Sequence, residues 1–126
     1  MKYRTLLRYS LPLASLLAFG LVASAQDAGS IARGKEQFAR QCAPCHGAGR
    51  GDFGRVMLPG TDALRIKYQG KVPALLEQRT DLTPALIRTY VRKGTFSMPP
   101  FRKTELSDAQ VDEISAYLAS AARAVK

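Results

Sequence analysis

The sequence predicts an all-α domain in which three principal helices are joined by long loops. Three stretches carry apolar residues at helical spacing and are bounded by helix-capping residues, whereas no stretch shows the sustained alternation of a strand. The chain has 126 residues, of which 46% are hydrophobic and 23% charged, a composition typical of one small globular domain. Long loops are unusual in such a domain unless they are functional or surround a bound group.

The N-terminal 25 residues have the features of a secretory signal peptide. An apolar run over residues 11–22 is too short to span a bilayer and is interrupted by Pro12. Basic residues precede this run, and a small-residue cleavage pattern follows it: Lys2, Arg4 and Arg8 before, Ala23-Ser24-Ala25 after. We therefore expect cleavage after Ala25, a domain of residues 26–126, and a periplasmic location with no transmembrane anchor. An uncleaved anchor is the alternative.

The first predicted helix covers residues 30–41. Ile31, Gly34 and Phe38 fall on one of its faces, and Ser30 can cap its start. A glycine inside a helix costs about 1 kcal/mol relative to alanine. Gly34 therefore either permits close packing by another element or is merely tolerated.

The second predicted helix lies within residues 83–94. Thr83 is a suitable N-cap, Pro84 fits the first helical position, and Gly94 fits the position after the end. The residues expected on its buried face are Leu86 and Tyr90, together with Ile87 and Val91.

The third predicted helix covers residues 107–120. Ser107 and Gln110 form a capping-box pattern at its start. Its narrow apolar stripe, which we expect in the core, consists of Val111, Ile114, Leu118 and Ala121, with Tyr117 beside them.

The segment between the first two predicted helices is less regular. Residues 47–54 hold four glycines in eight positions, which indicates a flexible loop. Short helices are possible over residues 62–68 and 73–78.

Cys42, Cys45 and His46 are the only cysteines and the only histidine of the chain, and they stand together as Cys-Ala-Pro-Cys-His. A redox disulfide is one interpretation, but that motif is expected at a helix N-terminus after a strand, whereas here it follows a helix. A zinc site is another, but it would need a fourth ligand from elsewhere. The third interpretation is covalent attachment of one c-type haem, with His46 brought under the iron.

Two methionines follow the predicted signal peptide, Met57 and Met98. A methionine thioether opposite histidine gives a closed haem suited to electron transfer. Met98 follows the end of a predicted helix and precedes two prolines, which stiffen its loop. We expect Met98 to be the second iron ligand; a core methionine at this position, or ligation by Met57, are the alternatives.

The sequence resembles the bacterial class I, monohaem cytochromes c in three separate blocks. These are Gly34-x3-Phe38-x3-Cys42-Ala-Pro-Cys45-His46-Gly47, Met98-Pro-Pro-Phe101, and Leu106-Ser-x6-Ile114-x2-Tyr117-Leu118, where x stands for an unmatched position. The resemblance implies a cytochrome c-like fold with thioether bonds at Cys42 and Cys45 and with His46 and Met98 as iron ligands. It also implies that Gly34 and Phe38 lie where the first helix crosses the last, near Tyr117 and Leu118. The carbonyl of Pro59 is expected to accept a hydrogen bond from the His46 ring.

Residues 26–126 hold 16 basic and ten acidic residues, a net charge of +6 that suggests an acidic protein partner. Nucleic acid fits poorly, because no long basic run is present. The residues expected to flank the haem edge are Arg88, Arg92, Lys93, Arg102 and Lys103, and those expected near the haem propionates are Arg65, Lys67 and Tyr68.

A haem with both axial positions filled has no open site for a substrate, and the carboxylates are too scattered to suggest catalytic residues. The resemblance therefore implies a non-enzymatic, periplasmic one-electron carrier between a dehydrogenase and a terminal oxidase or another cytochrome. The longer segment of residues 61–82 resembles that of cytochromes found beside flavoprotein dehydrogenases that act on phenolic compounds. A tightly bound subunit of such a dehydrogenase is one alternative, and a five-coordinate haem enzyme or gas sensor is another.

Overall fold

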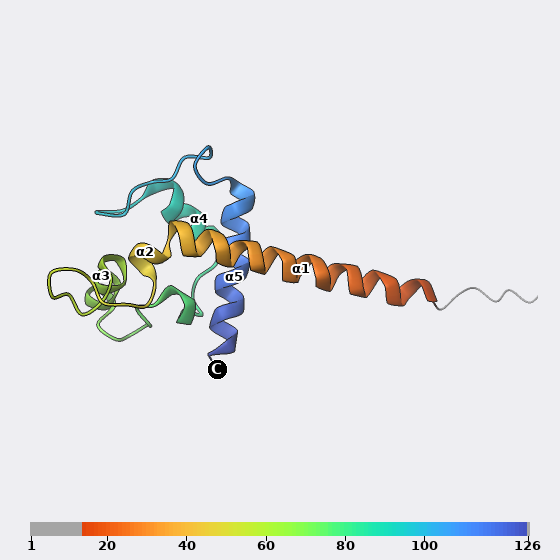
Figure 1. Ribbon diagram of the computed structural model, residues 1–126, viewed down its shortest axis with the longest axis horizontal. Helices are drawn as coiled ribbons and strands as arrows, with labels where there is room; N and C mark the ends of the chain where they lie inside the picture. The colour runs from red at the N-terminus through yellow and green to blue at the C-terminus, as the bar shows by residue number, and fades with distance from the viewer. Residues whose placement is uncertain (1–13, 126) are drawn as a thin grey trace, which may run out of the picture.

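The computed structural model describes the backbone of residues 14–125 and the side chains of residues 28–125. Its elements (Figure 1) are α1 (Ala14–Gln41), α2 (Ala43–His46), α3 (Pro59–Tyr68), the 3-10 helix η1 (Leu76–Gln78), α4 (Pro84–Lys93) and α5 (Asp108–Ala124). In this part of the chain the only strand-like pairing is an isolated bridge between Thr95 and Met98. The all-α prediction is confirmed.

Helix α1 is longer than the predicted helix of residues 30–41, because it already begins at Ala14. The added stretch is rich in alanine and leucine, which are strong helix formers, and it contains no proline. The predicted cleavage point after Ala25 falls inside this continuous helix, while the basic start of the predicted signal peptide lies outside the described residues. Cleavage itself stays a prediction. Over the range that the structure describes, no helix combines the length and apolarity needed to cross a membrane.

The ends of α4 and α5 are capped as the sequence predicts. The Thr83 hydroxyl accepts a hydrogen bond from the Leu86 amide at 3.2 Å, and Gly94 ends α4 with a left-handed φ of 63°. Ser107 and Gln110 form the expected capping box, in which each side chain accepts from the other residue's backbone amide, at 3.2 and 2.8 Å. Local chemistry therefore fixes where both helices begin.

The core lies where α1 crosses α5 and where α4 packs beside them (Figure 1). Gly34 lies directly against the backbone of Glu113 and Ile114, and the Phe38 and Tyr117 rings are 5.5 Å apart between centroids. The expected helix crossing is confirmed. The buried cluster consists of Phe38, Val91, Leu106, Val111, Ile114 and Leu118.

Only two of the four residues expected on the buried face of α4 pack into the core. Val91 is fully buried and Ile87 packs against the core, whereas Leu86 and Tyr90 are only half-buried. Ile87 and Val91 are one turn apart and share the face that α5 covers. Tyr90 lies on an adjacent face that is turned toward α3, since the ammonium group of Lys67 lies 6.0 Å from its ring centroid.

The structure also differs from the predicted elements in three smaller details. In α5 the buried residue near the C-terminus is Ala122, while Ala121 is half-buried. The short helix expected over residues 62–68 starts earlier, at Pro59, which occupies the first helical position. The one expected over residues 73–78 shrinks to the single turn η1.

Candidate cofactor site

The Cys-Ala-Pro-Cys-His motif occupies a single helical turn directly after α1. The amides of Cys45 and His46 both donate to the carbonyl of Cys42, at 3.1 and 2.8 Å, which forms α2. Cys42 in turn donates to the carbonyl of Phe38 at 2.9 Å, so the motif continues from the core helix. The two thiols and the imidazole are thereby held by a rigid support.

The two competing interpretations of this motif find little support in the geometry. Both cysteines are free thiols, and burial, followed by the neighbouring Cys45, raises the pKa of Cys42 to about 11. A reactive redox dithiol needs the opposite, a thiolate at neutral pH. Across the described residues, no three His, Cys, Asp or Glu side chains are grouped to hold a metal ion such as zinc.

His46 is half-buried against the start of α3. A Cβ atom on Gly60 would lie 2.7 Å from the imidazole Cε1 and 2.9 Å from Nδ1, so only glycine fits there. The buried Thr61 hydroxyl donates to the carbonyl of Gly47 at 3.1 Å, which ties α3 to the end of α2. Burial lowers the pKa of His46, which favours the neutral imidazole that binds a metal.

Gly60 and Thr61 are site residues that the sequence reasoning missed. Gly60 lies in the first turn of a helix and does not have a left-handed φ, so conformational freedom does not explain it. No local sequence pattern pointed to this close contact, because the φ of Gly60 is known only from the structure.

The hydrogen bond expected between His46 and Pro59 is not formed. The His46 Nδ1 atom is buried and has no hydrogen-bond partner. Pro59 is the first residue of α3, where a helical carbonyl points along the axis toward the residue four positions later. The expected hydrogen bond to the Pro59 carbonyl was therefore wrong for the structure described.

Met98 lies in a short turn that is fixed on both sides. Thr95 and Met98 exchange two backbone hydrogen bonds of 3.0 and 2.8 Å, and the Phe101 amide donates to the carbonyl of Val91 at 2.8 Å. Met98 and Cys42 are both half-buried and both pack against the same core cluster. Met57 lies in the loop of residues 47–58 and is not among the residues packed on that core.

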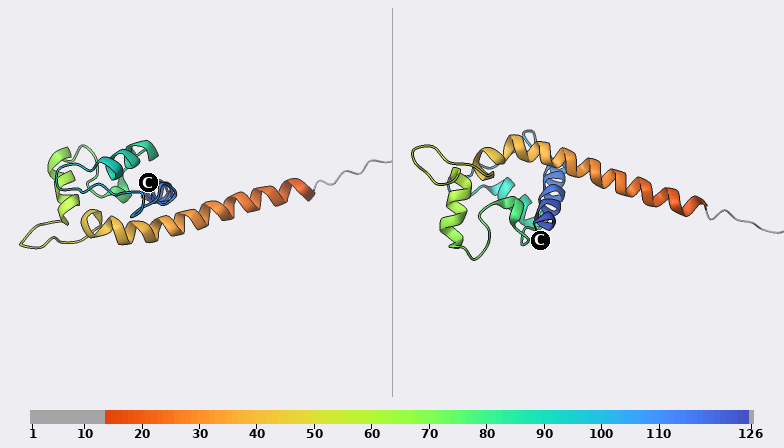
Figure 2. Two further views of the ribbon diagram at one scale, coloured as in Figure 1. Left: turned by 90° about the horizontal axis from the view of Figure 1, so that it is seen from above. Right: turned by 60° about the horizontal axis from the view of Figure 1, so that its bottom comes forward.

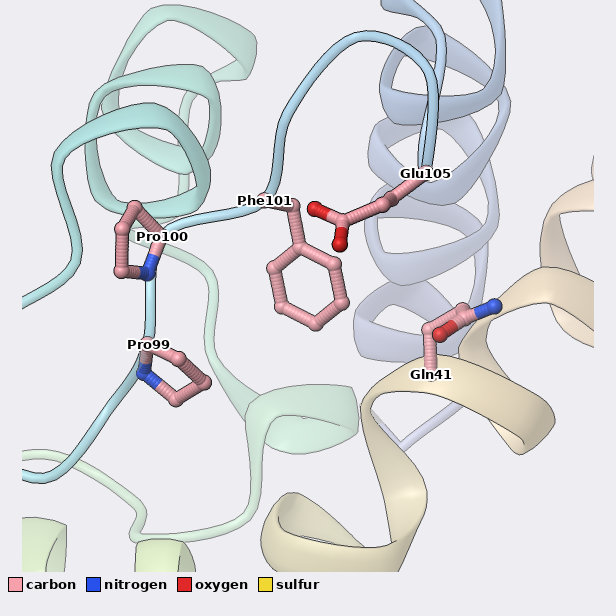
Figure 3. A pocket seen from close by; sticks show the side chains of 5 residues that line it. All are labelled: Gln41, Pro99, Pro100, Phe101 and Glu105. Atoms are coloured by element: carbon pink, nitrogen blue, oxygen red, sulfur yellow. The ribbon is translucent and has the colours of Figure 1, made fainter.

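An open pocket of about 420 Å³ connects the segments that carry Cys42 and Met98. Its lining residues are Gln41, Pro99, Pro100, Phe101 and Glu105. In Figure 3 Pro99 and Pro100 lie on one side of this space and Gln41 and Glu105 on the other, with the Phe101 ring between them. Gln41 immediately precedes Cys42, and Pro99 immediately follows Met98. The fold thus brings the two predicted ligand segments to opposite sides of one opening.

The three residues expected near the haem propionates have different surroundings. Arg65 is paired with Asp62 at 2.8 Å, whereas the Lys67 ammonium lies 5.2 Å from the ring centroid of Tyr68. Arg79, which sequence reasoning missed, lies 4.6 Å from the same ring and is only 5% exposed. A hydrogen bond from Arg79 lowers the pKa of Tyr68. Lys67 and Tyr68 therefore lie together beside Arg79, whose guanidinium already donates to Asp81.

Most of the basic residues expected to flank the haem edge are held in ion pairs. Arg92 and Lys103 both contact Asp108, each at 2.7 Å. The other pairs are Arg88 with Asp112 and Arg102 with Glu105. Within residues 28–125, Lys93 is the one member of that set without an ion-pair partner. Their local positive charge is therefore smaller than the sequence suggests.

Comparison with known proteins places this site in a family. Residues 29–118 match the family model described as cytochrome c oxidase, cbb3-type, subunit III. The chain is also 32% identical over 110 residues to a protein named cytochrome c6 from Picosynechococcus sp. (strain ATCC 27264 / PCC 7002 / PR-6), an alignment that covers 87% of this chain and 86% of that protein. No solved structure matches the chain. The chain therefore belongs to the cytochrome c family and is a monohaem cytochrome c, an electron-transfer protein that binds haem c covalently.

Proposed function

We propose that Cys42 and Cys45 form the two thioether bonds to the haem and that His46 and Met98 ligate its iron. The observation that carries this proposal is the opening of Figure 3, whose lining residues Gln41 and Pro99 are the sequence neighbours of Cys42 and Met98. The lowered pKa of His46 fits the proposal as well, because it favours the neutral imidazole that binds a metal. When bound, the haem supplies a one-electron Fe(III)/Fe(II) couple.

The residues around these ligands have distinct tasks in that arrangement. Gly60 leaves room for the imidazole, and the hydrogen bond from Thr61 to Gly47 keeps α3 beside it. The paired backbone hydrogen bonds of Thr95 and Met98 hold the second ligand in a fixed turn. A site that keeps its geometry when the charge of the iron changes transfers an electron with little rearrangement.

The biological role that fits best is that of an exported, periplasmic carrier. It would accept electrons singly from a dehydrogenase and pass them to a respiratory acceptor, either a terminal oxidase or another cytochrome. The signal-peptide pattern supports export, and the lack of any catalytic residue pair supports a carrier rather than an enzyme. The matched family model, named for an oxidase subunit, is consistent with a respiratory setting.

The ligand proposal is tested by comparing Met98→Ala with Met57→Ala in the haem-loaded protein. We expect the ferric wild type to show the absorption band of methionine-to-iron(III) ligation at the red end of the spectrum. Met98→Ala should abolish this band and Met57→Ala should keep it. The reverse pattern would transfer the role to Met57. A wild type without the band that binds carbon monoxide when reduced would instead indicate a five-coordinate haem enzyme or gas sensor.

The carrier role is tested by gel filtration of an extract from cells that make the native protein. A freely diffusing carrier should elute at the size of this chain alone at high salt. Persistent co-elution with a flavoprotein would show that the protein is a fixed dehydrogenase subunit, and the carrier proposal would then fail.

A further inference from the structure

Two phenylalanine side chains project into solvent from backbone positions that disfavour them. Phe53 and Phe96 have φ angles of 56° and 47°, and their exposures are 102% and 106%. Glycine and asparagine are the residues that such left-handed positions favour. A fully exposed ring gains nothing from burial within its own chain. Both left-handed positions therefore destabilise the fold, and burial of the rings within the molecule does not offset this. We take this as a sign that the rings contact another molecule.

Each of these rings stands at the tip of a tight, hydrogen-bonded turn. Phe53 and Gly54 are both left-handed, and the Arg55 amide donates to the carbonyl of Asp52 at 3.3 Å, as in a type I′ turn. Phe96 lies in the turn that Thr95 and Met98 close with their two hydrogen bonds. We call Phe53 and Phe96 the aromatic tips. The hydrogen bonds of these turns fix the backbone from which both rings project into solvent.

The aromatic tips lie near the two proposed iron ligands in the sequence. Phe53 lies in the loop of residues 47–58, which begins directly after His46, and Phe96 is two residues before Met98. Figures 1 and 2 show that this loop, in yellow-green, and the turn that follows α4, in cyan, project from the same end of the molecule. The long N-terminal part of α1 extends in the opposite direction. A protein that contacts both tips would lie beside the haem.

Unpaired positive charge accompanies the aromatic tips. Arg50 and Arg55 flank Phe53, and Lys93 lies three residues before Phe96. All three are exposed, and within residues 28–125 none of them has an ion-pair partner. The cations farther along the chain, at residues 102 and 103, are bound to the molecule's own carboxylates. Lys93 is thus the one cation of the expected haem-edge set that stays unpaired, and Arg50 and Arg55 add unpaired charge beside Phe53.

We propose that the aromatic tips form the docking surface for the electron-transfer partner, and that they contact an apolar patch rimmed by carboxylates. This inference rests on the proposed haem ligation by His46 and Met98. Aromatic side chains are enriched at the centres of protein interfaces, and complementary charge speeds the encounter. A lipid surface fits less well, because a partner held between the two ligand-bearing segments must itself accept or donate an electron.

The test uses the haem-loaded double variant Phe53→Asn with Phe96→Asn. Asparagine tolerates left-handed backbone, so we expect the melting temperature to rise by about 4 °C or more and the visible spectrum to stay unchanged. The probe is a reduced flavodoxin, a small acidic flavoprotein, which gives one electron to the ferric haem. We expect the second-order rate to fall by about tenfold, the order of one interface contact worth 1.4 kcal/mol. The second-order rate of reduction by the small ion hexacyanoferrate(II) should stay within about twofold of the wild-type rate.

The matched control is Gln69→Asn, which relieves a left-handed residue with a φ of 50° at the end of α3 without removing a ring. It should raise the melting temperature and leave both rates unchanged. A lower melting temperature or a shifted spectrum in the double variant would show that the rings pack on the haem of their own molecule, and would overturn the proposal. An unchanged flavodoxin rate would also overturn it.

A second comparison separates a protein partner from a membrane. Arg50→Gln, Arg55→Gln and Lys93→Gln combined should flatten the salt dependence of the flavodoxin rate, whereas Arg102→Gln with Lys103→Gln should change it little. If the tips are needed only for binding to phosphatidylglycerol vesicles and not for the flavodoxin rate, the protein-docking proposal is wrong. A wild type that lacks the methionine-ligation band would contradict the haem ligation itself, whatever the docking results.

Discussion

Gly34 of α1 lies so close to Glu113 of α5 that a methyl group on Gly34 would overlap the Glu113 carbonyl oxygen. The same methyl group would lie 3.1 Å from the amide nitrogen of Ile114. The obstacle is backbone rather than a movable side chain, so the two helices could accommodate alanine only by moving apart. Of the two explanations that the sequence left open for this glycine, close packing is the correct one.

Gly34→Ala should therefore destabilise the protein strongly. We expect a loss of about 3 kcal/mol in the free energy of unfolding, at the upper end of the usual cost of overpacking a core. Chemical denaturation followed by circular dichroism measures this. Gly29→Ala is the control on the same helix, because its methyl group would meet only the flexible end of Arg33 at 3.4 Å. Equal stability of the two variants would contradict the close crossing.

The parts of the fold that the sequence predicts well are those set by local chemistry. Thr83, Gly94 and the Ser107–Gln110 pair each fix a helix end through bonds to their own neighbours, so their residue types alone are informative. The Cys-Ala-Pro-Cys-His turn belongs to the same class. The correct prediction of these features needed no knowledge of the rest of the chain.

Features that depend on contacts between distant segments were harder to foresee. Val91 rather than Tyr90 is buried because α5 covers that face of α4. The spacing of apolar residues along α4 allowed either face to be the buried one. Gly60 beside His46 and Arg79 beside Tyr68 are separated by 14 and 11 residues along the chain and have no local pattern. The ion pairs of Arg88 and Arg92 with α5 could not be predicted from the sequence either. The free positive charge expected around the haem edge was therefore overestimated.

Gly60→Ala should disturb the imidazole of His46. The added methyl group would lie 2.7 Å from Cε1 and 2.9 Å from the Cys45 carbonyl oxygen, so the ring or α3 must move. We expect haem still to be attached through the cysteines, with a weakened methionine-ligation band and a lower melting temperature. Visible spectroscopy and thermal denaturation of the haem-loaded variant would show both effects. A spectrum and melting temperature identical to those of Gly29→Ala would contradict this account of the site.

Arg79→Gln should raise the pKa of Tyr68. The Arg79 guanidinium is the main cause of the lowered pKa of that phenol, through a side-chain hydrogen bond. The variant also loses the two contacts of Arg79 with Asp81, at 2.9 and 2.5 Å. We expect a loss of roughly 1 kcal/mol in stability, near the usual net contribution of a hydrogen bond, because the Asp81 carboxylate left behind is 45% exposed.

Tyrosine ring resonances followed by NMR during an alkaline titration would measure the change at Tyr68 separately from other phenols. The control is Arg102→Gln, which removes an exposed ion pair with Glu105. It should leave the Tyr68 titration as it is in the wild type. A Tyr68 pKa that does not move in Arg79→Gln would show that the two side chains do not interact in solution.

Asp108→Asn should destabilise the protein at neutral pH but not in strong acid. Lys103 and then Arg92 hold the pKa of Asp108 at about 2, below its value of about 3.9 in an unfolded chain. Because the folded-state pKa is the lower one, the charged carboxylate stabilises the fold above about pH 4, and this contribution disappears as the pH falls through about 2. Melting temperatures of wild type and variant should therefore differ at pH 7 and converge below about pH 2. Lys103→Met should move the convergence to higher pH, since Asp108 then loses its principal partner. A difference between wild type and Asp108→Asn that persists unchanged into strong acid would assign the effect to packing rather than to charge.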